Sequence, residues 1–213
     1  MHRLLGASLL AVAVSAGPAL SAGSCKDEVA AAFTKQRASH AFSMAADVRG
    51  ESGAVKITVE YIPPDRMRQT IIAPNQRPLE TVLVGTRAWS RQGGGWEELM
   101  PAVAQTIIAQ VRQAAVDPPK EVGEFECVDK ATIDGKEYLA YRSVEAHGGE
   151  AKGSTVSRPV HRTIYVDPKT GLPAMNIVME DEPDAVPLFH GVYAYPADLK
   201  IEGFPNAPLV KIR

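Results

Sequence analysis

A β-hairpin is encoded by residues 40–61, HAFSMAADVRGESGAVKITVEY, and this stretch decides the fold. Apolar side chains recur at every second position from Phe42 to Val48 and again from Val55 to Tyr61. A period of two is typical of a strand with one buried face, and the glycines at 50 and 53 supply the turn between the two strands. We therefore expect an antiparallel sheet with one apolar face and one wet face.

Strands of the same kind follow this hairpin toward the C-terminus. We expect them at residues 66–72, 79–84, 87–91, 121–129, 136–144, 160–166 and 172–180, and a last strand region is expected at 189–195 together with 198–201. Helical spacing of apolar residues predicts two helices, at residues 26–38 and 101–115, and a polar, glycine-rich loop is expected at 145–158. A sheet of nine or ten strands must curl, and its apolar face needs a cover that only the helices can supply. The predicted fold class is α+β: a strongly curved antiparallel sheet, or incomplete β-barrel, with helices covering the concave face.

The N-terminus predicts export. Residues 1–22 begin with a short positive region and continue with an uncharged apolar run from Leu4 to Val14. Small residues then follow Pro18, which is typical of a cleavable signal peptide. The run is shorter than the roughly 20 residues that a membrane-spanning helix needs. We expect a periplasmic protein whose mature part, residues 25–213, forms a single domain.

The two cysteines, Cys25 and Cys127, allow two interpretations. An exported protein with an even number of cysteines most often pairs them, which predicts a Cys25–Cys127 disulfide. The alternative is a lipoprotein anchored to a membrane through an acylated Cys25 just behind the signal peptide. Ala22 stands three residues before that cysteine, where a lipoprotein signal usually carries Leu, so we favour the disulfide.

The sequence offers little chemistry for catalysis. The formal net charge is −2 and no run of Lys and Arg occurs, which argues against nucleic acid as a partner. No serine lies in a GxSxG elbow, no two histidines have metal-ligand spacing, and no motif for a cofactor occurs. We expect no enzyme, no metal and no cofactor, and an enzyme with an unrecognised site is the weakest interpretation.

Two segments, YIPPDRMR at 61–68 and ETVLVGTRAW at 80–89, resemble the periplasmic lipoprotein-carrier family of LolA and its relatives. The matching positions are Pro64, Met67, Arg68, Gly85 and Trp89. The resemblance implies an incomplete barrel capped by helices that carries acyl chains without a covalent bond. Pro63 stands where the family often has a basic residue, so a general carrier of hydrophobic ligands is a safer expectation than a true lipoprotein chaperone.

These arguments predict a carrier whose ligand lies in a hydrophobic cavity between sheet and helices. The expected cavity-lining residues are Met44, Ile57, Val59, Met67, Leu83, Trp89, Ile107, Ile177 and Met179. Arg68 is the expected contact for a head group. The expected partners are lipid or lipoprotein acyl chains and a membrane-bound donor or acceptor protein, with the carrier itself a monomer. A sensor or interaction module of the same fold, without a transported ligand, is the alternative.

Overall fold

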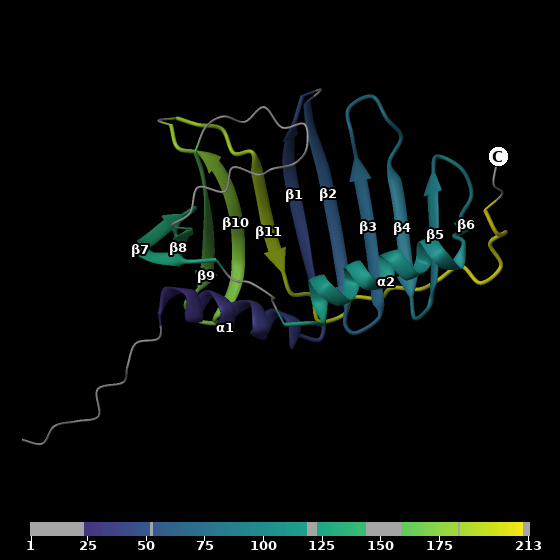
Figure 1. The fold of residues 1–213 in the computed structure, drawn as a ribbon, viewed down its shortest axis with the longest axis horizontal. Coiled ribbons are helices and arrows are strands. Elements are labelled where there is room, and N and C mark those ends of the chain that lie inside the picture. Colours follow the sequence, from purple (N-terminus) through teal and green to yellow (C-terminus); the bar gives the residue numbers. More distant parts are fainter. Residues whose placement is uncertain (1–23, 52, 119–122, 144–158, 183, 211–213) are drawn as a thin grey trace, which may run out of the picture.

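The computed structural model describes residues 24–51, 53–118, 123–143, 159–182 and 184–210. Two helices and eleven strands lie in these ranges (Figure 1). The helices are α1 (Cys25–Arg37) and α2 (Pro101–Ala115). The strands are β1 (Phe42–Gly50), β2 (Gly53–Ile62), β3 (Arg66–Ile72), β4 (Leu79–Val84), β5 (Arg87–Gln92), β6 (Glu97–Glu98), β7 (Phe125–Ile133), β8 (Lys136–Ser143), β9 (Val160–Asp167), β10 (Leu172–Glu180) and β11 (Phe189–Ala194).

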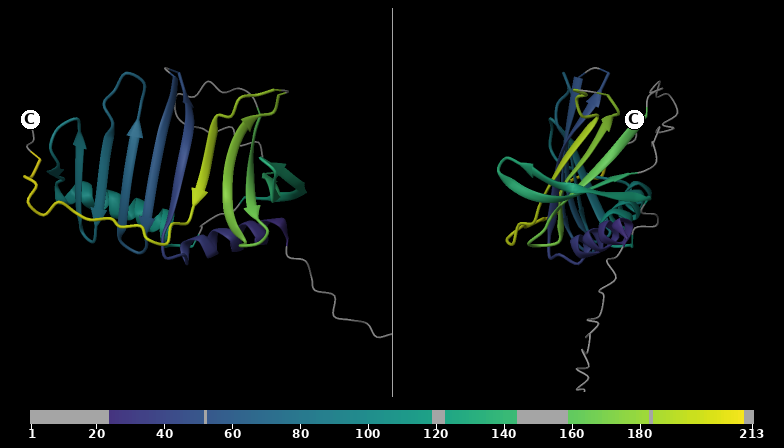
Figure 2. Two further views of the ribbon diagram at one scale, coloured as in Figure 1. Left: turned by 180° about the vertical axis from the view of Figure 1, so that it is seen from behind. Right: turned by 90° about the vertical axis from the view of Figure 1, so that its left-hand side faces the viewer.

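All eleven strands form one antiparallel sheet in the order β6-β5-β4-β3-β2-β1-β11-β10-β9-β8-β7. The last strand, β11, pairs with β1 and so joins the two halves of the sheet. β6 and β7 are the two edges and do not pair with each other, so the sheet stays open. Its twist turns β7 and β8 strongly across the other strands (Figure 2).

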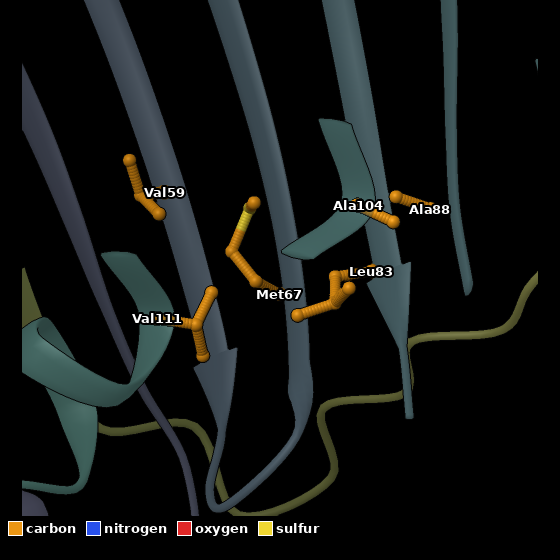
Figure 3. Packing of buried hydrophobic residues seen from close by; sticks show 6 residues of the cluster. All are labelled: Val59, Met67, Leu83, Ala88, Ala104 and Val111. Carbon is orange, nitrogen blue, oxygen red and sulfur yellow. The ribbon is translucent and has the colours of Figure 1, made fainter. Parts of the chain in front are cut away.

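Both helices lie on the same side of the sheet, which we call the inner face (Figure 2). α2 crosses the lower ends of β2 to β5, and its Ala104 and Val111 contact Val59, Met67 and Leu83 (Figure 3). All five side chains are buried. Ala104, which is 1% exposed, is small enough to let the helix axis approach the strands closely. The lower inner face is thus a packed core.

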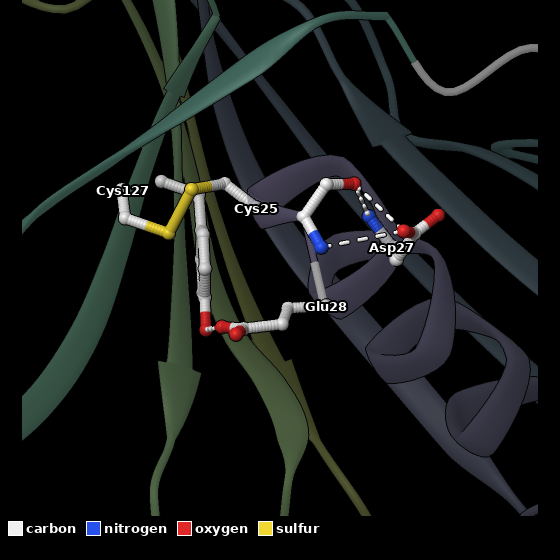
Figure 4. Close-up of a disulfide and its surroundings, with 6 residues drawn as sticks. Cys25, Asp27, Glu28 and Cys127 are labelled. Carbon is white, nitrogen blue, oxygen red and sulfur yellow. Dashed lines mark hydrogen bonds between the residues drawn. A yellow bond between two sulfur atoms is a disulfide. The ribbon is translucent and has the colours of Figure 1, made fainter. Parts of the chain in front are cut away.

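α1 covers the other half of the inner face, over β8, β9 and β10. Val29 and Ala32 of this helix pack against Tyr141, Ile164 and Val166. Its N-terminus is capped by Ser24, whose hydroxyl accepts a hydrogen bond from the Asp27 amide in a capping box. The disulfide between Cys25 and Cys127 joins the first turn of α1 to the edge strand β7 (Figure 4).

A segment near the C-terminus covers the opposite, outer face at one end of the sheet. Ile201 and Phe204 pack there against Val82 and Trp89, which are 2% and 3% exposed. Phe204 also stacks on Trp96, with ring centroids 4.0 Å apart. This segment is no helix or strand, and its only ladder contact in the described range is a parallel bridge between Glu98 and Leu209.

The predicted architecture of a curved open antiparallel sheet with helices on one face is confirmed, and so is the disulfide. Because both sulfur atoms are paired, Cys25 has no free thiol for acylation. The last strand region was expected to include residues 198–201, which have no ladder partner in the described range. The predicted signal peptide and the loop expected at 145–158 lie outside the described residues. In the described part, neither helix has the length and hydropathy that crossing a bilayer requires.

The disulfide is expected to make a large contribution to stability because it closes a loop between cysteines 102 positions apart. In the chain-entropy model such a loop contributes up to about 4.7 kcal/mol, and losses of about 2–5 kcal/mol are typical. We predict that Cys127→Ser lowers the free energy of unfolding by about 2–5 kcal/mol in urea denaturation. The Cys25→Ser, Cys127→Ser double variant should lose the same amount, and unchanged stability in both would contradict the prediction.

Candidate functional site

The candidate site is the part of the inner face that lies above the helices in Figure 1. Seven apolar side chains meet there across six strands, and none of them is fully buried. We call them the upper strip: Leu79, Ile71, Ile57, Val55, Val48, Phe189 and Val178. The ladder makes the strip continuous, since Leu79 pairs with Ile71, Ile71 with Ile57, Val55 with Val48, Val48 with Phe189, and Phe189 with Val178. Strands spaced about 4.8 Å apart give it a length of about 24 Å.

Gly191 leaves room for the ring of Phe189 at the centre of the strip. A side chain at this position would place its Cβ 2.8 Å from the ring of Phe189 and 3.4 Å from the sulfur of Met44. The Phe189 ring therefore lies over the backbone of Gly191 and presents a flat apolar surface beside Met44. Met44 itself is half-buried on the same face, opposite Val59 and Tyr193.

Four of the predicted cavity-lining residues belong to the core beneath α2. Val59, Met67 and Leu83 are 1–6% exposed and in direct contact with the helix, and Ile107 packs against the same cluster. These side chains fill the region in which the sequence predicted space for a ligand. Ile57 also packs against this cluster but keeps some exposed surface, so it lies at the margin between the core and the upper strip, and Met44 lies beside it.

The structure corrects the prediction for four other site residues. Their side chains point away from the face that the helices cover, so they do not line a cavity between sheet and helices. Trp89, Ile177, Met179 and Arg68 lie on the outer face, because each alternates with an inner-face neighbour on its strand. Trp89 is buried by the C-terminal segment, and Arg68 forms an ion pair with Glu60 across the β2–β3 ladder. Neither therefore shares a surface with the upper strip.

A polar cluster that the sequence did not reveal lies on the inner face below and beside the strip, under the C-terminal end of α1. Its centre is Tyr193, whose ring packs edge-on against Phe33 at a centroid distance of 6.3 Å. Burial raises the pKa of the Tyr193 hydroxyl. Arg37 and Arg162 both interact electrostatically with this hydroxyl, and burial lowers the pKa of each guanidinium.

Hollows lined by described residues occur elsewhere on the molecule, and one of them includes Ile57 of the strip. One of about 260 Å³ lies at the start of β9 beside His161, and one of about 270 Å³ lies on the outer face near His190. A third, of about 410 Å³, is lined by Trp96 and Phe204. The first two have charged walls, and no group of His, Cys, Asp and Glu among the described residues could hold a metal ion.

No protein-family model matches the sequence, and no curated protein matches it either. Solved structures do match. LprF from Mycobacterium bovis has a TM-score of 0.54 at 12% identity, over 84% of this chain and 96% of that one. Lipoprotein LppX from Mycobacterium tuberculosis has a TM-score of 0.55 at 8% identity, over 84% and 98%. This chain shares its fold with LprF and LppX.

A LolA superfamily protein from Nitrosomonas europaea also matches, over 85% of this chain and 94% of that one, with a TM-score of 0.30 at 10% identity. At these identities, the similarity to LprF and LppX concerns the fold alone. The arrangement of strands and helices thus has counterparts among solved proteins, while the side chains of the upper strip are described from this chain.

Burial of Tyr61 on the inner face should make the free energy of unfolding depend on pH in the alkaline range. Burial raises the pKa of Tyr61, which packs beside the α2 core, to about 12, against about 10 in an unfolded chain. The folded state thus holds a proton that the unfolded state releases, so this stability is complete below pH 10 and is lost as the pH rises toward 12. We predict that wild type loses about 2–3 kcal/mol more than Tyr61→Phe over this interval, measured by urea denaturation. Parallel losses in both proteins would contradict the assignment.

Proposed function

We propose that this protein is an envelope carrier that binds an acyl chain or a similar apolar ligand, without a covalent bond, on the upper strip. The proposal rests on a difference in side-chain exposure between two parts of the inner face. The buried cluster beneath α2 is 0–6% exposed. The seven apolar side chains of the upper strip, of which Ile57 also packs against that cluster, keep accessible surface and form a continuous path across six strands. A continuous apolar row that keeps contact with water fits a binding site for an apolar ligand.

Burial of the strip would supply the driving force. Removing apolar surface from water stabilises by roughly 25 cal/mol per Å², or about 0.8 kcal/mol for each CH₂ group of the ligand. A chain of fourteen carbons that is half enclosed would gain on the order of 5 kcal/mol before ordering costs are subtracted. The ligand class that fits is therefore a long alkyl chain, and no catalytic step is part of the proposal.

The location agrees with this role. The disulfide between Cys25 and Cys127 is typical of an oxidising compartment, and the sequence predicts a signal peptide before it. The sequence resemblance to the LolA family, in which acyl chains are carried across the periplasm, supports the same proposal. We propose the periplasm as the compartment and lipid or lipoprotein acyl chains as the cargo, delivered to or from a membrane-bound partner.

The chain offers a matched pair of variants to test the strip. Ile57 faces the strip, and its neighbour Thr58 is exposed on the outer face of the same strand. We predict that Ile57→Asp weakens binding of a fluorescent fatty acyl probe at least tenfold, because a carboxylate placed along the alkyl path must lose hydration when the ligand binds. Thr58→Asp should change the affinity less than twofold. Both variants should first be shown to fold by circular dichroism.

Equal effects of the two substitutions would mean that the strip is not the binding surface. If wild type binds no acyl probe, and native mass spectrometry of protein purified from membrane-containing cells finds no lipid, the carrier proposal fails. That outcome would favour the interaction or sensor module that the sequence left as its alternative.

A further inference from the structure

The upper strip ends at an arginine. In the β9–β10 ladder, Val178 pairs with Arg162, so the apolar row that runs through Val55, Val48, Phe189 and Val178 continues directly into a guanidinium. Four strand spacings of about 4.8 Å separate Val55 from Arg162, a distance of about 19 Å. An amphiphilic ligand has this same order of parts, a long apolar chain and one polar head.

The arginine is held in place by its neighbours and is only partly exposed. Its Nε donates a hydrogen bond of 2.8 Å to Asn176 Oδ1, and its backbone amide donates one of 3.0 Å to Ser143 Oγ. Among the described residues, the two Nη atoms of Arg162 have no hydrogen-bond acceptor. Asn176 therefore orients the guanidinium, and the described part of the chain leaves its Nη donors available to a ligand.

A second arginine approaches the same place from α1. Arg37 Nη1 donates a hydrogen bond of 3.2 Å to the carbonyl oxygen of Phe33, one turn earlier in the helix. The Nε atom of Arg37 is buried and has no hydrogen-bond partner. The ring of Phe33 packs against that of Tyr193, which places the end of α1 beside Tyr193. Both arginines also interact electrostatically with the Tyr193 hydroxyl, so the two cations lie on the same part of the inner face.

No anion balances these two charges in the described part of the chain. Neither guanidinium forms an ion pair with a described carboxylate, although five other arginine and lysine side chains on the sheet do. Tyr193 is a neutral phenol at neutral pH, since the ordinary tyrosine pKa is about 10 and burial raises the pKa of this hydroxyl further. Partly desolvated cations without a counter-ion are costly, and arginine donors of this kind bind carboxylates and phosphates well.

We propose that Arg162 and Arg37 bind the anionic group of the ligand, a carboxylate or a phosphate, whose alkyl chain then lies along the upper strip. This inference rests on the proposed carrier function and names its ligand class as an anionic amphiphile. Arg162 is the principal contact because it stands in the same row as the strip. Tyr193 and Asn176 hold the cluster together and contribute a hydroxyl and an amide beside the anion.

The test compares two lipids that differ in charge. One is 1-palmitoyl-lysophosphatidylglycerol, which carries a phosphate, and the other is 1-palmitoylglycerol, which has the same chain and is neutral. Isothermal titration with the full mature chain should show wild type binding the anionic lipid at least about tenfold more tightly, as charge-assisted hydrogen bonds predict. Arg162→Gln should reduce this ratio to about two or less and leave the affinity for the neutral lipid within twofold.

Two further variants make the result decisive. Arg37→Gln should reduce the same ratio in part, and it replaces Arg162→Gln if that variant fails to fold. Arg142→Gln removes an exposed arginine from the outer face of the neighbouring strand β8 and should leave the ratio unchanged.

The possible outcomes separate the two proposals. A ratio in Arg162→Gln and Arg37→Gln equal to that of wild type would overturn the anion site while leaving the carrier function intact. Binding of neither lipid to wild type would overturn the carrier function itself. Inorganic phosphate binding as tightly as the anionic lipid would show that the cluster takes free anions and would overturn its role as a head-group site.

Discussion

Strand alternation is the constraint on which this structure depends. An antiparallel sheet of eleven strands presents one largely apolar face, and that face must be removed from water. Two helices are available for the task, and each covers the half of the sheet closest to it. Because both cross the strands near one end, the core is densely packed there and the apolar surface continues beyond it. The candidate site is the consequence of a cover that is shorter than the face it protects.

The remaining features fix this cover in position. The disulfide holds the start of α1 to the far edge strand, and Tyr141 donates a hydrogen bond of 2.5 Å to Glu28 of the same helix. On the outer face, the C-terminal segment buries Trp89 and Val82 and so protects the end of the sheet opposite the disulfide. With both ends secured, the sheet can remain open between its edges without depending on closure into a barrel. An open sheet, in turn, keeps the upper strip accessible from its side.

Local patterns in the sequence predict most of the elements but only part of the site. Alternation in β1 and β2 and helical spacing in α1 and α2 are properties of neighbouring residues, so they can be read directly. Which face of a later strand points inward depends on register, and the register of β10 is altered by an irregularity between Pro173 and Met175. Pro173 pairs with Val166 of the inner core, and beyond the irregularity Ile177 and Met179 lie on the outer face. The cluster of Arg37, Arg162 and Tyr193 joins residues from three distant elements, and no short-range pattern reports such a meeting.

The central claim is that an alkyl chain contacts the inner face above the helices. Methyl-labelled NMR tests it most directly, because Ile57 and Ile71 lie in the upper strip while Ile177 lies on the outer face and Ile201 in the outer core. On addition of a palmitoyl lipid, the account predicts intermolecular NOEs from the alkyl chain to the methyl groups of Ile57 and Ile71, and none to those of Ile177 or Ile201. NOEs to Ile177 or Ile201 with none to Ile57 and Ile71 would contradict it.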